Sequence, residues 1–181
     1  MKPSEIPDMP PWLRGSEMGE LIYARDWDES GLGPIPAWPP SLRLAVGMLL
    51  PLPSAGLLLW GPKLIQIYND HYRDLMGAKH PGGLGQPVRE CWPELWDFLG
   101  PICDGVMQRR ESFMFDDKRL VVERHGTPEE AFFKLTCSPV PGGITEASVA
   151  DVSDAGRDAL APGGVLVTVS ETTGVIRARA L

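Results

Sequence analysis

Three strand-like segments follow one another in the C-terminal part of this chain, and they constrain its fold more than any other feature. After Glu111 the hydrophobic pattern alternates. Strands are predicted at Ser112–Asp116 with Leu120–Glu123, at Glu130–Pro139 and at Gly164–Thr173. A doubly wound parallel sheet needs strands and helices to alternate along the chain. Because no helical pattern separates these strands, the sequence predicts an α+β fold with an antiparallel sheet.

Two further strands are predicted upstream. Ala55–Trp60 is apolar throughout and Leu64–Tyr68 alternates. The Gly61-Pro62 pair between them is a turn signal, so the two segments read as a hairpin. The complete sheet is therefore expected to have five strands.

A helical block separates the hairpin from the last three strands. Asn69 is placed to cap a short helix that ends at Gly77. The longest helical pattern runs over Pro93–Arg110, and Gly100-Pro101 inside it predicts a kink or a break into two helices. We expect this block to cover one face of the sheet.

The N-terminal region reads as a helical extension of this fold. Residues 1–15 are predicted to form a loose leader. Ser16 is placed to cap a helix that continues to Arg25, and Ser41 to cap a second helix that stops before Pro51. The predicted organisation is a leader and helix at 1–40, a sheet domain at 41–174 with a loop insert at 142–163, and the start of another helix at 175–181.

Charge and composition exclude several classes of function. The 181 residues carry a net charge of −7, whereas a nucleic-acid-binding surface needs a basic stripe. The most apolar run, Val46–Trp60, is shorter than a membrane span and is interrupted by prolines. The three cysteines form no CxxC pair, and the N-terminus lacks the apolar core of a signal peptide. We therefore expect a cytoplasmic protein with reduced thiols, without a membrane span and without a nucleic-acid partner.

A series of short motifs occurs in order along the chain. They are Trp60-Gly61-Pro62, Tyr68-Asn69-Asp70-x-Tyr72, Leu75-Met76-Gly77, Lys79-His80-Pro81, Leu84-Gly85, Glu90-x-Trp92-Pro93-Glu94-x-Trp96, Ser138-Pro139-Val140 and Val169–Thr173. A leader of the form GELIYARDW followed by LGPIPAWPPSL precedes them. With the order of two strands, a helical block and three strands, this series resembles the PAS domains at the N-termini of bacterial sensor histidine kinases. The resemblance extends over about residues 17–176.

This resemblance implies a signal-sensing input domain that regulates an output domain, expected to be a histidine kinase of a two-component system. The last strand would pass the signal to the helix that begins near Val175. PAS domains of this type usually have a short turn before that strand, where this chain has the insert at 142–163. No phosphoacceptor helix or glycine-rich ATP-binding box is present, so the chain itself is not expected to be an enzyme.

An alternative function is a dimerisation or protein-interaction module without a small ligand. In PAS proteins the N-terminal helix often packs against the sheet of a partner. Met18, Leu21 and Ile22 form an apolar face on the predicted helix 17–25. A homodimer through this helix and the sheet is therefore expected, and deletion of residues 1–30 would then give monomers.

The resemblance also implies a ligand cavity between the sheet and the helical block. The candidate lining residues are Trp60, Ile67, Tyr68, Tyr72, Trp92, Trp96, Phe113, Phe115, Phe133 and Leu135, with Arg89 or Lys79 as an anchor for an anionic group. Ligand pockets are mostly apolar with a few polar anchors. Apolar residues at this spacing also fill solid cores, so both interpretations stay open.

The cofactor is left unknown by the sequence. An oxygen-sensing haem needs an axial ligand, usually a histidine on the long helix, and that helix has none; His71, His80 and His125 lie elsewhere. A flavin-binding LOV domain needs an Asn-Cys-Arg-Phe-Leu-Gln type motif, whereas Cys91 is followed by Trp-Pro-Glu. Cys103 and Cys137 fall on apolar faces and read as core residues.

Neither a metal site nor an acid–base pair is predicted. The sequence has no HExxH motif, CxxC pair or EF-hand spacing. The acidic pairs Asp116-Asp117 and Glu129-Glu130 lie in predicted strand regions, where adjacent side chains point to opposite faces. Neither pair is therefore expected to converge on one substrate.

Overall fold

The chain forms one five-stranded sheet in which all neighbouring strands are antiparallel. The computed structural model describes residues 6, 8–143, 153 and 157–181. The strands are β1 (Ala55–Trp60), β2 (Ile65–Tyr68), β3 (Phe113–Val122), β4 (Glu129–Pro141) and β5 (Pro162–Glu171), in the spatial order β2-β1-β5-β4-β3. This arrangement confirms the predicted α+β class and the antiparallel sheet.

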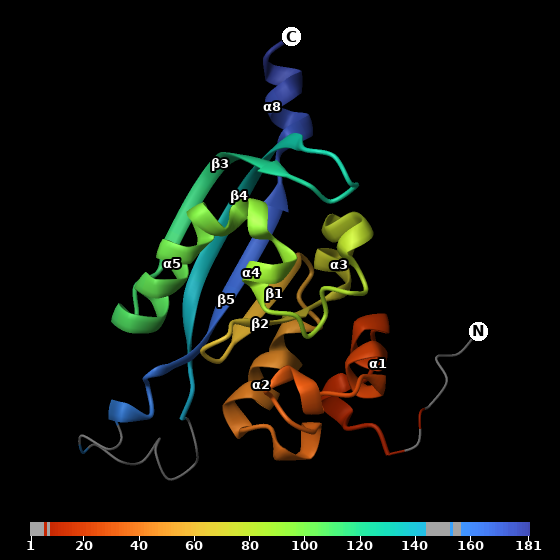
Figure 1. Cartoon of the computed structure of the whole chain (residues 1–181), viewed down its shortest axis with the longest axis vertical. Coiled ribbons are helices and arrows are strands. Elements are labelled where there is room, and N and C mark those ends of the chain that lie inside the picture. The colour runs from red at the N-terminus through yellow and green to blue at the C-terminus, as the bar shows by residue number, and fades with distance from the viewer. Residues whose placement is uncertain (1–5, 7, 144–152, 154–156) are drawn as a thin grey trace.

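The last strand of the chain lies in the middle of the sheet. β5 pairs with β1 on one side and with β4 on the other (Figure 1). The gap predicted between Asp116 and Leu120 is a bulge inside β3, where the register shifts between Phe115 and Lys118. Asp117 in the bulge has a φ of 47°, in the left-handed region. β3 is therefore one continuous, bent strand.

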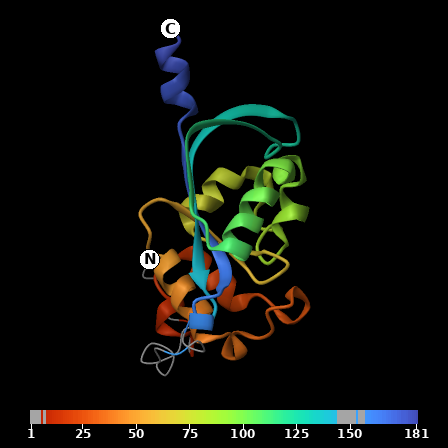
Figure 2. The ribbon, with the colours of Figure 1, turned by 90° about the vertical axis from the view of Figure 1, so that its left-hand side faces the viewer.

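The helical block covers one face of the sheet (Figures 1 and 2). It consists of α3 (Asp70–Met76), η4 (Gly77–Lys79), α4 (Val88–Cys91), η5 (Pro93–Leu95) and α5 (Trp96–Arg109). α3 contacts β1, and α5 contacts β4 and β5. We call the covered side the inner face and the opposite side the outer face.

The longest helix differs from its prediction at two points. The first turn after Pro93 is the 3₁₀ turn η5, and α5 begins only at Trp96. The helix then runs through Pro101 without the predicted break. Pro101 is exposed in the second turn, where it has no N–H to donate to the carbonyl of Asp97. Burial of Ile102, Cys103 and Val106 against the sheet offsets this loss.

The N-terminal segments pack beside the β1–β2 end of the sheet (Figure 1). They are η1 (Pro11–Leu13), α1 (Glu17–Ala24), η2 (Asp28–Ser30), η3 (Ile35–Ala37) and α2 (Pro40–Leu49). Met9 and Leu13 are buried in the same core as the sheet, so the described part of the leader is packed rather than loose. Residues 1–5 and 7 lie outside the described residues.

The two predicted N-terminal caps have different outcomes. Ser16 caps α1 as predicted, because its Oγ accepts a hydrogen bond from the backbone N–H of Gly19 at 3.0 Å. α2 instead begins at Pro40 with Pro39 as its N-cap, so Ser41 lies inside the helix. Proline suits the first helical position because its missing N–H would have no helical partner there.

The chain leaves the sheet through a short C-terminal helix. β5 ends at Glu171, and α8 (Thr173–Arg179) begins two residues before the predicted start at Val175. α8 projects away from the sheet and the helical block, and none of its residues is buried (Figure 2).

Of the insert at 142–163, residues 144–152 and 154–156 lie outside the described residues. Its described ends are joined by hydrogen bonds from Gly142 N to Ala161 O and from Gly143 N to Ala159 O.

Candidate functional site

A cavity of about 70 Å³ lies between the inner face of the sheet and the helical block. Its wall consists of Leu57, Leu59, Tyr72, Leu75, Trp92, Leu95, Leu99, Leu120, Val122, Arg124, Phe133, Leu135, Val167 and Val169. Successive strand residues alternate between the two faces, which is why positions two apart, such as Val167 and Val169, both face it. We call this space the inner cavity.

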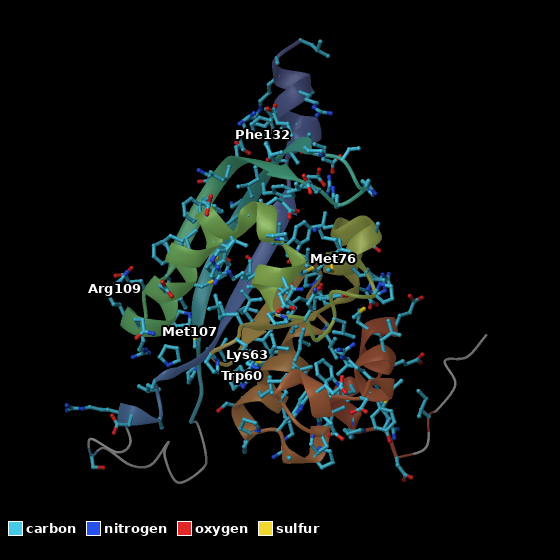
Figure 3. The ribbon with its side chains drawn as sticks, viewed as in Figure 1. Trp60, Lys63, Met76, Met107, Arg109 and Phe132 are labelled. Atoms are coloured by element: carbon cyan, nitrogen blue, oxygen red, sulfur yellow. The ribbon has the colours of Figure 1, made fainter. Side chains whose placement is uncertain are left out.

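Four of the ten predicted lining residues meet at the inner cavity, namely Tyr72, Trp92, Phe133 and Leu135. The other six lie elsewhere. Ile67 and Tyr68 are fully buried in the core, and Trp96, Phe113 and Phe115 are partly buried against it. Trp60 lies at the end of β1 near Lys63, far from Phe132 at the opposite end of the sheet (Figure 3).

The size of the inner cavity limits what it can hold. Pockets for drug-sized ligands measure about 300–1,000 Å³, and an engineered cavity that binds benzene measures about 150 Å³. At about 70 Å³ the inner cavity is smaller than both. Most of the predicted set fills the core, and the small inner cavity lies beside it.

The candidate cofactor ligands also lie away from the inner cavity. His71 and His125 are exposed, and Nδ1 of His80 lies 2.9 Å from the hydroxyl of Tyr68. Cys91 is buried, and burial raises the pKa of its thiol, so it is not a reactive thiolate. Burial likewise raises the pKa of Cys103 to about 12 and that of Cys137 to about 11.

Two of the residues that line this apolar space, Tyr72 and Trp92, carry polar groups on the helical block. Trp92 is 6% exposed, and its Nε1 is buried without a hydrogen-bond partner among the described residues. The hydroxyl of Tyr72 is its polar neighbour and interacts with it, although the pair falls outside strict hydrogen-bond geometry. Burial raises the pKa of Tyr72 well above its ordinary value, so its hydroxyl stays protonated.

Arg124 is the cationic residue of the cavity wall, and sequence reasoning missed it. Its Nη1 and Nη2 donate to the two carboxylate oxygens of Glu171 at 3.1 and 2.7 Å. Its Nε donates to Glu129, and Nη1 also donates to the carbonyl of Leu75 at 3.2 Å. One side chain thus joins α3, β4 and the end of β5. The bonds to Arg124 also hold the pKa of Glu171 below its ordinary range.

The junction with α8 lies directly beyond this ion pair. Oγ1 of Thr173, the first residue of α8, donates to Glu171 at 3.1 Å and accepts from the backbone N–H of Phe132 at 2.9 Å. The backbone N–H of Thr172 donates to the carbonyl of Phe132 at 2.7 Å. Figure 3 places Phe132 at the base of this helix. A short chain of bonds therefore runs from the cavity wall to α8.

The two residues predicted to anchor an anion have other partners. Nζ of Lys79 lies 3.3 Å from Glu94, donates to the carbonyl of Cys91 at 2.6 Å and sits 4.8 Å from the ring centre of Trp92. The guanidinium of Arg89 lies over the ring of Trp96 at 5.4 Å. Neither cation lines the inner cavity.

A second apolar hollow, of about 320 Å³, lies on the outer side of the molecule. It is lined by Ser41, Leu44, Ala45, Met48, Leu49, Leu52, Pro139, Val140, Pro141 and Leu166. Leu44 is 60% exposed and Met48 is 64% exposed, so a ridge of α2 stands beside the hollow. We call the ridge and the hollow together the outer groove.

The predicted N-terminal dimer helix is already packed within its own chain. Met18 and Ile22 are fully buried, and the backbone N–H of Met18 donates to Asp70 at 2.9 Å. Only Leu21 of the predicted apolar face is exposed, at 40%. In this structure α1 therefore covers the core of its own chain.

The acidic pairs singled out in the sequence form ion pairs. Glu129 pairs with Arg124 and Glu130 with Arg119, while Asp116 lies 3.8 Å from Lys134. Within the described ranges, no three histidine, cysteine or acidic side chains form a group that could hold a metal ion. A search of the same residues finds no helix long and apolar enough to cross a membrane.

Comparisons with known proteins include a weak structural likeness. No protein-family model matches the chain, and no curated protein matches it. A solved structure of an RsLOV variant is similar, with a TM-score of 0.42 and 18% identity over 65% of this chain and 60% of that chain. This chain thus spans less than two thirds of the length of the RsLOV chain, and the likeness is too weak to carry an argument.

The fold assignment rests on the topology of the chain itself. Two strands, a helical block and three further strands form an antiparallel sheet in the order β2-β1-β5-β4-β3. The block covers one face only (Figure 2), and the strand order places the last strand between the first strand and β4. This arrangement is a PAS-like fold.

Proposed function

We propose that this chain is a signal-sensing PAS input domain that regulates an output domain. The observation that carries the proposal is the link between the inner cavity and α8. Arg124 in the cavity wall binds Glu171, and Glu171 accepts a hydrogen bond from the first residue of α8. A signal that moves Arg124 would therefore change how α8 is attached to the sheet.

The size of such a response has a physical limit. A ligand shifts the equilibrium between two arrangements only by the difference in its affinities for them. The ion pair between Arg124 and Glu171 can take two such arrangements. In one the two side chains are in contact, and in the other they are apart and each is solvated by water. Glu171 is partly exposed and Arg124 keeps Glu129 as a second partner, so opening the pair does not leave a charge buried without a partner.

The nature of the output domain and the location of the protein are further parts of this proposal. The motif series from Trp60 to Thr173 supports a histidine kinase as the output domain. Free, buried cysteines support a cytoplasmic location. The ion pairs of the candidate acidic residues support a chain that is not itself an enzyme.

The coupling is tested by hydrogen exchange of the backbone amides of residues 173–179. Val167→Leu adds one methylene group to the cavity wall, and Leu166→Met is a matched control on the outer face of the same strand. We expect Val167→Leu to change exchange in α8 about five-fold, the effect of a coupling near 1 kcal/mol. The same change should be absent in the Glu171→Gln background, where the ion pair is lost. Equal exchange in Val167→Leu and the control would refute the sensor function.

A second candidate function is a homodimerisation module, and the outer groove favours it. Its ridge, Leu44 and Met48, lies beside its own hollow, so two copies related by a two-fold axis can each insert the ridge into the hollow of the other. Light scattering over a range of concentrations tests this. We expect Met48→Glu to give monomers and Leu21→Glu on α1 to leave dimers intact. A monomeric wild-type chain would exclude this function.

A further inference from the structure

The free edge of β3 is complementary to itself. β3 is an end strand of the sheet and pairs with β4 alone among the strands that the structure describes (Figure 1). We infer that this edge binds the same edge of a second copy of the chain, antiparallel, to give one continuous sheet with five strands from each copy. This surface is separate from the outer groove, to which β3 contributes no residue, and the inference does not depend on the sensor function.

The two end strands of the sheet differ in what covers them. Along β2, the backbone N–H of Gln66 donates to the carbonyl of Gln86 at 3.0 Å, and the N–H of Gly85 donates to the carbonyl of Gln66 at 2.8 Å. Within the described ranges, no backbone group of β3 bonds to any segment other than β4. Unpaired N–H and C=O groups along a strand edge can pair with another strand. The free edge of β3 is therefore open to a partner, whereas that of β2 is covered.

The residue types along β3 match in pairs about a midpoint between Asp117 and Lys118. When two copies lie antiparallel in this register, the opposed residues are Phe113 and Val122, Met114 and Val121, Phe115 and Leu120, Asp116 and Arg119, and Asp117 and Lys118. Every apolar residue then meets an apolar residue, and every acidic residue meets a basic one. Cross-strand pairs of both kinds stabilise antiparallel sheets.

The direction of the side chains follows the same symmetry. Positions 113, 115, 118, 120 and 122 are partly or fully covered, whereas 114, 116, 119 and 121 are exposed. Each pair from 113 with 122 to 116 with 119 therefore joins two residues on the same face. Met114 and Val121 are 65% and 40% exposed in the single chain, and this pairing would cover them. Backbone groups alternate in direction together with side chains, so the groups that point outward also oppose one another.

The charges at the centre of β3 select this register over its neighbours. A shift of one residue would oppose covered positions to exposed ones. A shift of two residues would place Asp116 opposite Asp117, or Lys118 opposite Arg119. Charged residues and a bulge ordinarily keep an edge strand from pairing with other chains. Here the charges disfavour the other registers and are satisfied in this one.

The neighbouring strand extends the charge pattern. Asp116 lies 3.8 Å from Nζ of Lys134, and Arg119 pairs with Glu130, both on β4. These four side chains are 45–67% exposed, so each pair contributes little by itself. Across the interface the order would be Lys134 and Asp116 of one copy, then Arg119 and Glu130 of the second copy. Charges of alternating sign would thus cross all four strands.

The test reverses the central charges in two separate variants of the whole chain. Two copies of Asp116→Arg would oppose basic side chains, and two copies of Arg119→Asp would oppose acidic ones. Each variant alone should dimerise about thirty-fold more weakly than the wild type, because two attractive pairs become repulsive. An equimolar mixture of the two variants should recover most of the wild-type affinity, because each introduced side chain then faces the opposite charge. Sedimentation velocity over a concentration series measures all three.

Asp28→Arg is the matched control for these variants. It changes the net charge as Asp116→Arg does, but it lies on η2 and should leave the dimer unchanged. Hydrogen exchange of the wild-type chain gives an independent measurement, in which the outward amides of β3 should exchange more slowly as the concentration rises. This readout remains decisive if a variant does not fold.

Four results would overturn this inference. They are a monomeric wild-type chain, single variants that associate as the wild type does, a mixture that associates no better than its components, and exchange in β3 that is independent of concentration. A dimer that is lost in Met48→Glu and kept in Asp116→Arg would belong to the outer groove instead. The sensor function is tested apart from all of these, by the response of α8 to Val167→Leu.

Discussion

At the scale of single residues, Asn69 joins three elements through one buried side-chain amide. Its Oδ1 accepts from the backbone N–H groups of Gly56 and Tyr72, both at 3.0 Å. Its Nδ2 donates to the carbonyls of Ser54 at 2.9 Å and Leu49 at 3.2 Å. The same residue therefore caps α3, fixes the start of β1 and holds the end of α2.

Asn69→Ala is expected to lower the free energy of unfolding by about 3 kcal/mol, because four hydrogen bonds are lost inside the protein. Ser16→Ala is the matched control, since it removes a cap with one hydrogen bond and should cost about 1 kcal/mol. Urea denaturation measures both values. Equal losses would show that the three additional bonds of Asn69 contribute nothing.

His80 makes stability depend on pH in a defined window. Burial and the nearby charge of Arg73 lower the pKa of its imidazole below 6.5. The unfolded state therefore binds more protons near pH 6.5, so the contribution of His80 is complete above that pH and is lost as the pH falls through the folded pKa. We expect the urea midpoint to fall below pH 6.5 in the wild type and to stay flatter in His80→Gln. An imidazole that titrates at or above pH 6.5 by NMR would contradict this.

At the scale of elements, α5 continues through Pro101, where the sequence pattern predicted a kink or a break into two helices. Pro101 is exposed, so replacing it removes little packing, and an alanine there regains the N–H for the carbonyl of Asp97. We expect Pro101→Ala to stabilise the fold by about 1–2 kcal/mol, after allowing for the greater freedom of the unfolded chain.

The matched control for this change is Pro93→Ala. Pro93 occupies the first position of η5, where a backbone N–H has no helical partner. That substitution should therefore be neutral or slightly destabilising in thermal unfolding. If both substitutions raise the melting temperature equally, the gain does not come from the helical hydrogen bond.

The strands follow their sequence patterns more closely than the helices do. The hairpin and the last strand could be predicted from local periodicity because alternation and turn residues lie within a few positions of each other. The bulge in β3 depends on how that strand pairs with β4. The sequence pattern predicted only an interruption between the strand segments Ser112–Asp116 and Leu120–Glu123.

At the scale of the whole molecule, the N-terminal region belongs to the core. Met9, Leu13, Met18, Ile22 and Trp27 are all buried. Each large buried side chain contributes about 2–5 kcal/mol, against a total stability of about 5–15 kcal/mol for an ordinary domain. Deletion of residues 1–30 is therefore expected to abolish cooperative unfolding, instead of producing the folded monomers that a free dimerisation helix would give.

Circular dichroism melting of the shortened chain measures this. Truncation after Gly174 is the control, because α8 contributes no buried residue and its removal should leave a cooperative transition. A sharp melt in the chain without residues 1–30 would mean that the sheet and the helical block fold without this segment.

The sequence predicted only part of the candidate site, because four of the ten expected lining residues border the cavity. Tyr72, Trp92, Phe133 and Leu135 were found because aromatic and leucine residues at strand and helix spacing favour the inner face. Trp60 and Phe113 are aromatic too but lie elsewhere. Which apolar side chains border a cavity depends on the strand register and on where the helices cross the sheet, and neither is encoded within one segment.

By itself, the sequence determined the order of the elements, the antiparallel sheet and the cap at Asn69. These features depend on residues close together in the chain, where periodicity and turn chemistry act. Only the tertiary structure decided that the N-terminal segment is packed, that the cavity is small and that Arg124 joins it to α8. Arg124 lies 47 positions from Glu171 and 49 from Leu75, so no local pattern could pair them. Such contacts arise only when distant segments fold against one another and their polar groups must find partners away from water.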